Sequence, residues 1–233
     1  MSAGQPLVER YAALRRDAEA MGLAARGGFH PESEDGVPAF PDGAAAATVV
    51  IFGFVGGLQW RAFSASAERG DGAPDALDRW SRRVIDELGR RHHGVGLYPN
   101  GGPPWLPFQR WAMRAESVHR SPLGVLIHPL YGLWHSYRGA LAFQERIDLP
   151  AGEPRPNPCD ACAAKPCLAT CPVGAVTRAG YDAPGCRHHV AAAAGRDCLE
   201  LGCGARRSCP IGAAYRYSPE QAEFHMRAFI GRR

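Results

Sequence analysis

The chain has 233 residues, of which 45% are hydrophobic and 21% are charged. This is the balance of a globular protein that can bury a core, and no run of about eighteen apolar residues suggests a membrane span. The net charge of +4 comes from 26 arginines and one lysine set among acids, so we expect no nucleic-acid-binding surface. The N-terminus lacks the apolar segment of a signal peptide, and we expect a cytoplasmic protein.

The first half of the chain predicts helices and one buried strand. Residues 6–22 show apolar residues at helical spacing, which predicts a helix. Residues 27–43 are rich in Gly, Pro and acids and are expected to form a loop. Residues 47–55 are a continuous apolar, β-branched run, which predicts a strand buried on both faces. Residues 74–91 predict a second amphipathic helix, with Asp75 as its cap.

Further elements follow before the composition changes. We expect a short helix at 108–117, then two strands, Leu123–Ile127 and Tyr137–Phe143, joined by a turn. Because strands alternate with helices, residues 1–150 are expected to form a mixed α/β domain. Residues 150–158 are a Pro-rich linker, and all eight cysteines follow it. We expect residues 151–233 to form a second, smaller domain that folds around bound metal.

The first four cysteines form the pattern C-x2-C-x4-C-x3-C-P, from Cys159 to Pro172. Bacterial ferredoxins bind [4Fe-4S] clusters with C-x2-C-x2-C-x3-C-P. The two patterns differ only in the middle gap, where Ala-Ala-Lys-Pro supplies two more residues. The other four cysteines are spaced less regularly, but both groups end alike, in CPVGA at 171–175 and CPIGA at 209–213. This short repeat is typical of a two-cluster ferredoxin, and we expect each Gly-Ala pair to begin a helix.

In two-cluster ferredoxins the fourth cysteine of each group binds the other cluster. Applied here, this crossed pattern predicts two [4Fe-4S] clusters and leaves no thiol over. The predicted ligands are Cys159, Cys162, Cys167 and Cys209 for the first cluster, and Cys171, Cys186, Cys198 and Cys203 for the second. Structural zinc stays open as an alternative, although only one C-x2-C pair is present. A single cluster with spare thiols and a disulfide framework are also open, the latter disfavoured in a cytoplasmic protein.

Aromatic, histidine and arginine side chains are dense in residues 121–143, just before the cysteines. We take four of them as candidates for binding a cofactor: His128, Tyr131, Trp134 and Arg138. The alternative is a polar turn that packs on the core. Two pairs of adjacent histidines, at 92–93 and 188–189, do not have metal-ligand spacing, and we assign them no role. The loop 100–105 either contacts a ligand or is a long turn.

A segment of this kind followed by a two-cluster ferredoxin module resembles the epoxyqueuosine reductase family and, more distantly, the iron–sulfur reductive dehalogenases. The matching residues are Gly124-Val125-Leu126-Ile127, Tyr131-Gly132-Leu133-Trp134, Gly139-Ala140-Leu141, and Cys159 to Pro172. The stretch Gly124–Leu141 is also similar to the cobalamin-processing CblC proteins. The resemblance covers about residues 105–215. It implies a nitroreductase-derived, CblC-like sheet domain with a corrinoid pocket, followed by a ferredoxin-like domain.

Two departures from the epoxyqueuosine reductases matter. No carboxylate occupies residues 103–108, where that family carries its proton donor ahead of a short helix. The family's C-terminal helical repeats, which act on tRNA, have no counterpart after Cys209-Pro210. We therefore do not expect epoxyqueuosine reductase activity.

The sequence thus predicts a redox protein that passes electrons through two clusters to a cofactor or small substrate bound by the N-terminal domain. The resemblance implies a corrinoid (cobalamin) as that cofactor, and a ferredoxin- or flavodoxin-type protein would donate the electrons. Two other functions stay open: an electron carrier without its own substrate, and a corrinoid-binding or trafficking protein. A flavin in place of the corrinoid is open too, because no phosphate-binding glycine loop decides between them.

Overall fold

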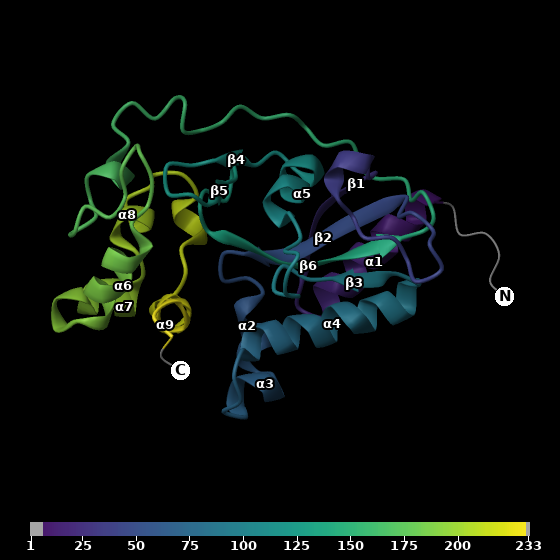
Figure 1. Ribbon diagram of the computed structural model, residues 1–233, viewed down its shortest axis with the longest axis horizontal. Helices are drawn as coiled ribbons and strands as arrows, with labels where there is room; N and C mark the ends of the chain where they lie inside the picture. The colour runs from purple at the N-terminus through teal and green to yellow at the C-terminus, as the bar shows by residue number, and fades with distance from the viewer. Residues whose placement is uncertain (1–6, 232–233) are drawn as a thin grey trace. The chain divides into compact units, whose positions relative to one another are not determined.

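The computed structural model describes residues 7–231, which divide into two compact units (Figure 1). Among the described residues, unit 1 contains 7–54, 58–117 and 136–154, and unit 2 contains 55–57, 118–135 and 155–231. The sequence alone put the division at residue 150, whereas the structure groups residues 118–135 with the cysteines. The reason is local: the turn at 128–132 packs against the backbone that follows Cys209.

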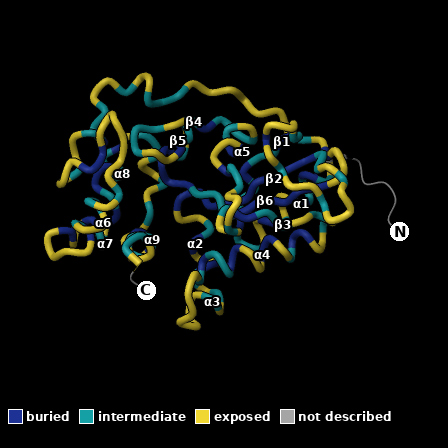
Figure 2. Tube along the Cα trace, viewed as in Figure 1, coloured by how far each residue is buried: buried dark blue, intermediate teal, exposed yellow. Residues whose placement is uncertain are grey.

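A four-stranded antiparallel sheet with helices forms unit 1, so the predicted mixed α/β architecture is confirmed. Its strand order is β1-β2-β6-β3. The strands are β1 (Ala24–Phe29), β2 (Thr48–Val55), β3 (Val95–Leu97) and β6 (His135–Phe143). All eight residues of β2 are buried, as the apolar run at 47–55 predicted (Figure 2). Its place between β1 and β6 leaves it no open edge.

Three longer helices pack in unit 1 and confirm the three predicted helices. They are α1 (Leu7–Ala20), α4 (Ala76–His92) and α5 (Phe108–Ala115), with short helices α2 (Trp60–Ser64) and α3 (Ala67–Gly70) between them and a 3-10 turn, η1 (Ser33–Asp35), after β1. Pro6, the predicted start of the first helix, lies outside the described residues. Trp80 of α4 meets Phe54 of β2 edge-on, with ring centroids 5.7 Å apart. Asp75 stands at the start of α4, but its side chain makes no capping hydrogen bond.

Two of the predictions for residues 1–150 are wrong in part. The expected loop at 27–43 begins within β1, because Gly27 (φ +92°) allows an irregularity in the β1–β2 pairing and the strand continues to Phe29. The strand expected at Leu123–Ile127 is reduced to β5 (Leu126–Ile127), which pairs with β4 (His119–Arg120) and not with β6. A turn closed by Gly124 (φ +75°) occupies the residues before it.

Unit 2 is helical in its C-terminal part and has short elements throughout. Its helices are α6 (Ala183–Ala191), α7 (Arg196–Leu201), α8 (Gly204–Arg207) and α9 (Pro219–Phe229), with 3-10 turns η2 (Pro166–Leu168), η3 (Ala193–Gly195) and η4 (Ala213–Tyr215). The side chain of Asp182 caps α6 and that of Ser218 caps α9, each by accepting a backbone N–H. Helices this short are only marginally stable by themselves and depend on tertiary packing.

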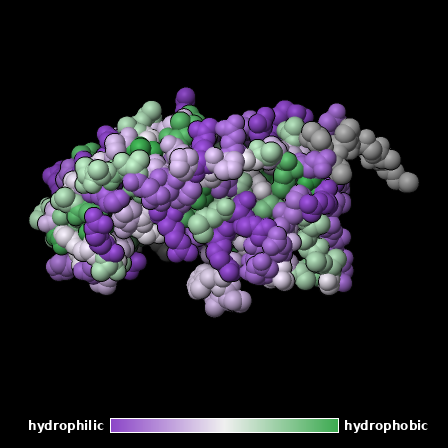
Figure 3. Space-filling view, turned by 90° about the horizontal axis from the view of Figure 1, so that it is seen from above, coloured by the Kyte–Doolittle hydropathy of each residue, from purple (hydrophilic) through white to green (hydrophobic). Residues whose placement is uncertain are grey.

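The surface is of mixed polarity. Hydrophilic residues are widespread on the face shown in Figure 3, with smaller apolar areas among them. Within residues 7–231, no helix combines the length and the apolar character needed to cross a membrane.

Candidate metal centres

The eight cysteines line two cavities in unit 2, four to each cavity. The first cavity is lined by Cys159, Cys162, Cys167 and Cys209; the second is lined by Cys171, Cys186, Cys198 and Cys203. Chain order alone would have put Cys171 with the first three cysteines and Cys209 with the last three. The structure exchanges these two residues, so the sets are those of the crossed ligand pattern. That the thiols bind metal is still a prediction.

The first cavity has apolar walls and one charged residue. Four prolines and the side chains of Ile127 and Ile211 complete its lining together with Lys165. The Lys165 ammonium Nζ donates a hydrogen bond to the backbone oxygen of Cys159, at 2.7 Å. Lys165 also precedes η2, the 3-10 turn that carries Cys167. The lysine therefore comes from the Ala-Ala-Lys-Pro segment that distinguishes this sequence from the ferredoxin pattern.

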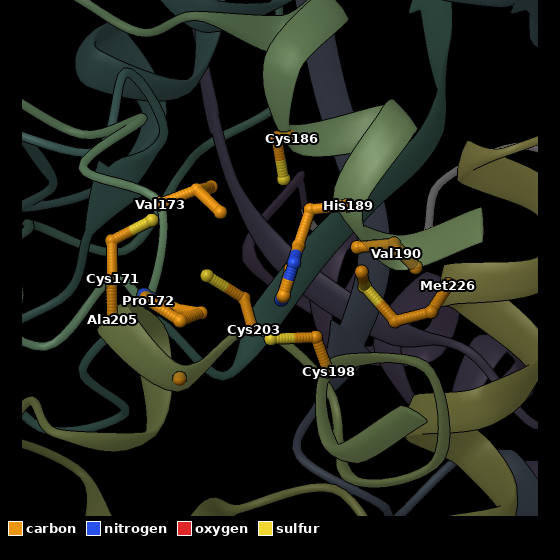
Figure 4. Close-up of a pocket in the computed structure, with 11 residues that line it drawn as sticks. Cys171, Pro172, Val173, Cys186, His189, Val190, Cys198, Cys203, Ala205 and Met226 are labelled. Atoms are coloured by element: carbon orange, nitrogen blue, oxygen red, sulfur yellow. The ribbon is translucent and has the colours of Figure 1, made fainter. Parts of the chain in front are cut away.

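The second cavity is shown in Figure 4, where the four thiols surround a common space. His189 is also part of the lining, and its ring lies among the cysteine side chains. The sequence analysis assigned His189 no role. It follows Cys186 by three residues in α6, a spacing that places two side chains on one face of a helix. The Asp182 cap and the proline after it were the signals that could have revealed that helix.

An apolar cluster joins the two sets of thiols. It is centred on Cys167, Val176 and Ala205, and Leu123, Leu168, Cys171 and Cys203 pack against it. Cys167 belongs to the first cavity, whereas Cys171 and Cys203 belong to the second. The two cavities are therefore neighbours within unit 2, separated by buried apolar side chains, Ala205 being fully buried.

Hydrogen-bond donors point at several of the sulfur atoms. The backbone N–H of Ala175 donates to Cys171 Sγ over 3.3 Å. The N–H groups of Gly204 and Ile211 donate to Cys198 and Cys209 respectively. This corrects one prediction: the Gly-Ala pair at 174–175 begins no helix, because Gly174 (φ +62°) forms a turn that aims the Ala175 N–H at the sulfur. At the second repeat, Ala213 does begin a short 3-10 helix, η4.

Burial raises the thiol pKa at five of the eight cysteines above its ordinary value. They are Cys159, Cys167, Cys198, Cys203 and Cys209. A buried thiol keeps its proton because the thiolate is poorly solvated, and a metal must displace that proton in order to bind. Loading of these cavities is therefore expected to release protons.

The donor set of each cavity fits an iron–sulfur cluster. Four cysteines line each cavity, and cysteine thiolates are the ligands of a [4Fe-4S] cluster. Among residues 7–231, no three His, Cys, Asp or Glu side chains are arranged as ligands of one metal ion.

The four residues of the predicted cofactor pocket are divided between the two units. His128, Tyr131 and Trp134 lie in unit 2, and Arg138 lies in unit 1. Arg138 forms an ion pair with Asp78 and donates from Nε to Ser81 Oγ over 3.1 Å. Its guanidinium is thus engaged within unit 1.

The three residues in unit 2 have distinct surroundings. The His128 ring stacks on Tyr131 with centroids 4.1 Å apart, and its Nδ1 accepts the N–H of Leu130. Trp134 is only 3% exposed and is contacted by Arg206, whose guanidinium carbon lies 4.6 Å from the ring centroid. Arg206 also lies over Tyr217, at 4.5 Å. Trp134 is therefore a packed residue in this structure, while the His128–Tyr131 pair is partly exposed.

The His128–Tyr131 pair belongs to a turn whose backbone contacts Ile211, a residue of the first cavity. A Cβ atom at Gly132 would lie 2.0 Å from the carbonyl oxygen of Ile211, which shows how closely the turn at 128–132 approaches the chain after Cys209. Ile211 itself lines the first cavity.

Comparison of the chain with protein-family models gives no match, and comparison with curated proteins gives no significant match. Function therefore has to be inferred from the residues of the site.

Proposed function

We propose that this chain is an iron–sulfur redox protein that holds two [4Fe-4S] clusters and passes electrons through them to a cofactor or small substrate. The observation that supports this most is the sorting of all eight cysteines into two cavities of four, with Cys171 and Cys209 exchanged between the sequence groups. The crossed set is the ligand arrangement of two-cluster ferredoxins. It also leaves no cysteine without a place in a cavity.

The chain's own residues would bind the clusters and tune them. Cysteine thiolates hold the iron, and the clusters when bound supply one-electron oxidation and reduction. Backbone N–H groups at Ala175, Gly204 and Ile211 donate to the ligand sulfurs, which favours the more negative, reduced state. Apolar side chains around Ala205 pack between the two sets of thiols. Neighbouring cavities suit electron exchange, because its rate falls steeply with distance.

For the electron acceptor we propose a ligand near the His128–Tyr131 pair, a corrinoid being the one that the sequence resemblance implies. The pair is partly exposed and its turn packs on Ile211 of the first cavity. In this proposal unit 1 corresponds to the nitroreductase-derived, CblC-like sheet domain and unit 2 contains the ferredoxin-like domain. A ferredoxin- or flavodoxin-type protein would supply electrons in the cytoplasm, where thiols stay reduced.

A second candidate is an electron carrier that has no substrate of its own. One observation favours it: Arg138, which the sequence analysis placed in the acceptor pocket, is paired with Asp78 in unit 1. The corrinoid-trafficking function has no comparable support from the geometry.

Anaerobic reduction distinguishes these functions. We expect the purified brown protein to bleach reversibly with dithionite, and the reduced protein to pass its electrons to added cob(II)alamin, because the acceptor site adjoins the first cavity. Absorbance spectra of protein and corrinoid measure both steps. The variant His128→Ala should bleach normally and transfer more slowly. Bleaching without any transfer would favour the carrier, and a protein with no reducible chromophore would contradict the redox function altogether.

A further inference from the structure

We propose that Lys165 sets the reduction potential of the first centre, and that the two-residue insertion between Cys162 and Cys167 serves to place it there. This inference rests on the proposed function, because a potential exists only if a cluster is bound. Its basis is that Lys165 is the only lysine in the chain and that the residues lining the two cavities include no other Lys, Arg, Asp or Glu.

The geometry holds the ammonium at the thiols. Nζ donates to the Cys159 backbone oxygen over 2.7 Å, which fixes the end of a long and otherwise flexible side chain. From this position the positive charge acts electrostatically on both Cys159 and Cys167, two of the four thiols of the first cavity. The backbone at Lys165 is left-handed (φ +38°), and its oxygen accepts the N–H of Leu168.

The other charged side chains near the first cavity are exposed to solvent, which screens their effect. Asp160, the acid nearest in the loop, is exposed, and its carboxylate accepts a hydrogen bond from the Asn157 side chain. Arg216 acts on Cys209 from an exposed position.

The second cavity has no Lys, Arg, Asp or Glu in its lining. Outside the lining, Asp197 and Arg207 act on Cys198 with opposite signs and form an ion pair with each other. The two centres therefore differ in electrostatic surroundings.

The consequence follows from charge. Reduction adds one negative charge to a core already ligated by four thiolates, and a cation held close by stabilises the reduced state more than the oxidised state. Lys165 thus raises the potential of the first centre and biases an electron toward it. The first cavity is also the one whose Ile211 wall packs on the His128–Tyr131 turn, so the bias holds the electron on the side of the proposed acceptor.

The test is a potentiometric titration of four full-length proteins, the wild type and three variants, under anaerobic conditions, followed by electron paramagnetic resonance. In Lys165→Gln, which removes the charge but keeps an N–H donor, we expect one midpoint potential to shift to a more negative value and the other to stay. Lys165→Arg keeps the charge and should leave both near their original values. The centre that shifts should be the one missing from a Cys159→Ala/Cys209→Ala variant.

Two outcomes would overturn the inference while leaving the proposed function intact. One is native iron content in Lys165→Gln with both potentials unchanged. The other is the same shift, or the same loss of iron, in Lys165→Gln and Lys165→Arg, which would show that the lysine acts through loop geometry and not through its charge. A wild-type protein that contains no iron would instead contradict the proposed function itself.

Discussion

A chain that carries both Cys159→Ala and Cys209→Ala is expected to keep one intact four-iron cluster, with about half of the iron of the wild type. The two cysteines are 50 positions apart in sequence but line the same cavity, so both substitutions fall on one centre. The second cavity keeps all four of its thiols, those of Cys171, Cys186, Cys198 and Cys203. Mössbauer spectroscopy of anaerobic protein counts intact clusters as well as total iron.

The matched control is Cys159→Ala with Cys171→Ala. These cysteines belong to the same sequence motif but line different cavities, so this variant removes one thiol from each centre and should keep no intact four-iron cluster. If ligands followed chain order, the two results would be reversed: the first variant would lose both clusters and the second would keep one. Retention of a cluster only in the Cys159/Cys171 variant would therefore contradict the crossed sets.

The variant Gly132→Ala is expected to lose the first centre and keep the second. Its Cβ would lie 2.0 Å from the Ile211 carbonyl oxygen, a distance that forces the chain after Cys209 to move. The left-handed backbone at Gly132 (φ +59°) adds about 1–2 kcal/mol of strain for any other residue. Iron content should fall by about half, as in a Cys209→Ala chain.

Gly124→Ala is the control for that substitution. Gly124 has the same left-handed backbone (φ +75°), but a Cβ there meets no atom within 4 Å. It should therefore show the backbone strain alone and keep its iron. Full iron content in Gly132→Ala, or an equal loss in both variants, would show that the close contact of the 128–132 turn with Ile211 does not matter for the first centre.

The sequence predicted the regular elements of unit 1 well where one physical signal dominated. The strand at 47–55 has no polar residue except Thr48, and the helix at 74–91 presents Leu77, Trp80 and Leu88 on one side, all buried. The prediction from sequence failed at Gly27, because the composition there allows a strand as well as a loop. It also failed at Gly124, where a turn takes the place of the first part of the predicted strand.

The candidate site was predictable to the extent that it depends on spacing. The repeat of CPVGA and CPIGA indicated the exchange of Cys171 and Cys209, which the cavities show. Tertiary contacts were not predictable in the same way. Nothing in the neighbourhood of Arg138 revealed that Asp78, 60 positions earlier, would bind it. Nor did the segment 121–143 show that its turn and its strand would lie in different units.

The most direct test of the central claim is the content of iron, inorganic sulfide and zinc in the anaerobically purified wild-type chain. Two [4Fe-4S] clusters predict about eight iron and about eight sulfide per chain, with no stoichiometric zinc. Stoichiometric zinc without sulfide would contradict the account, because it would mean that the two cysteine cavities hold single ions and cannot carry electrons.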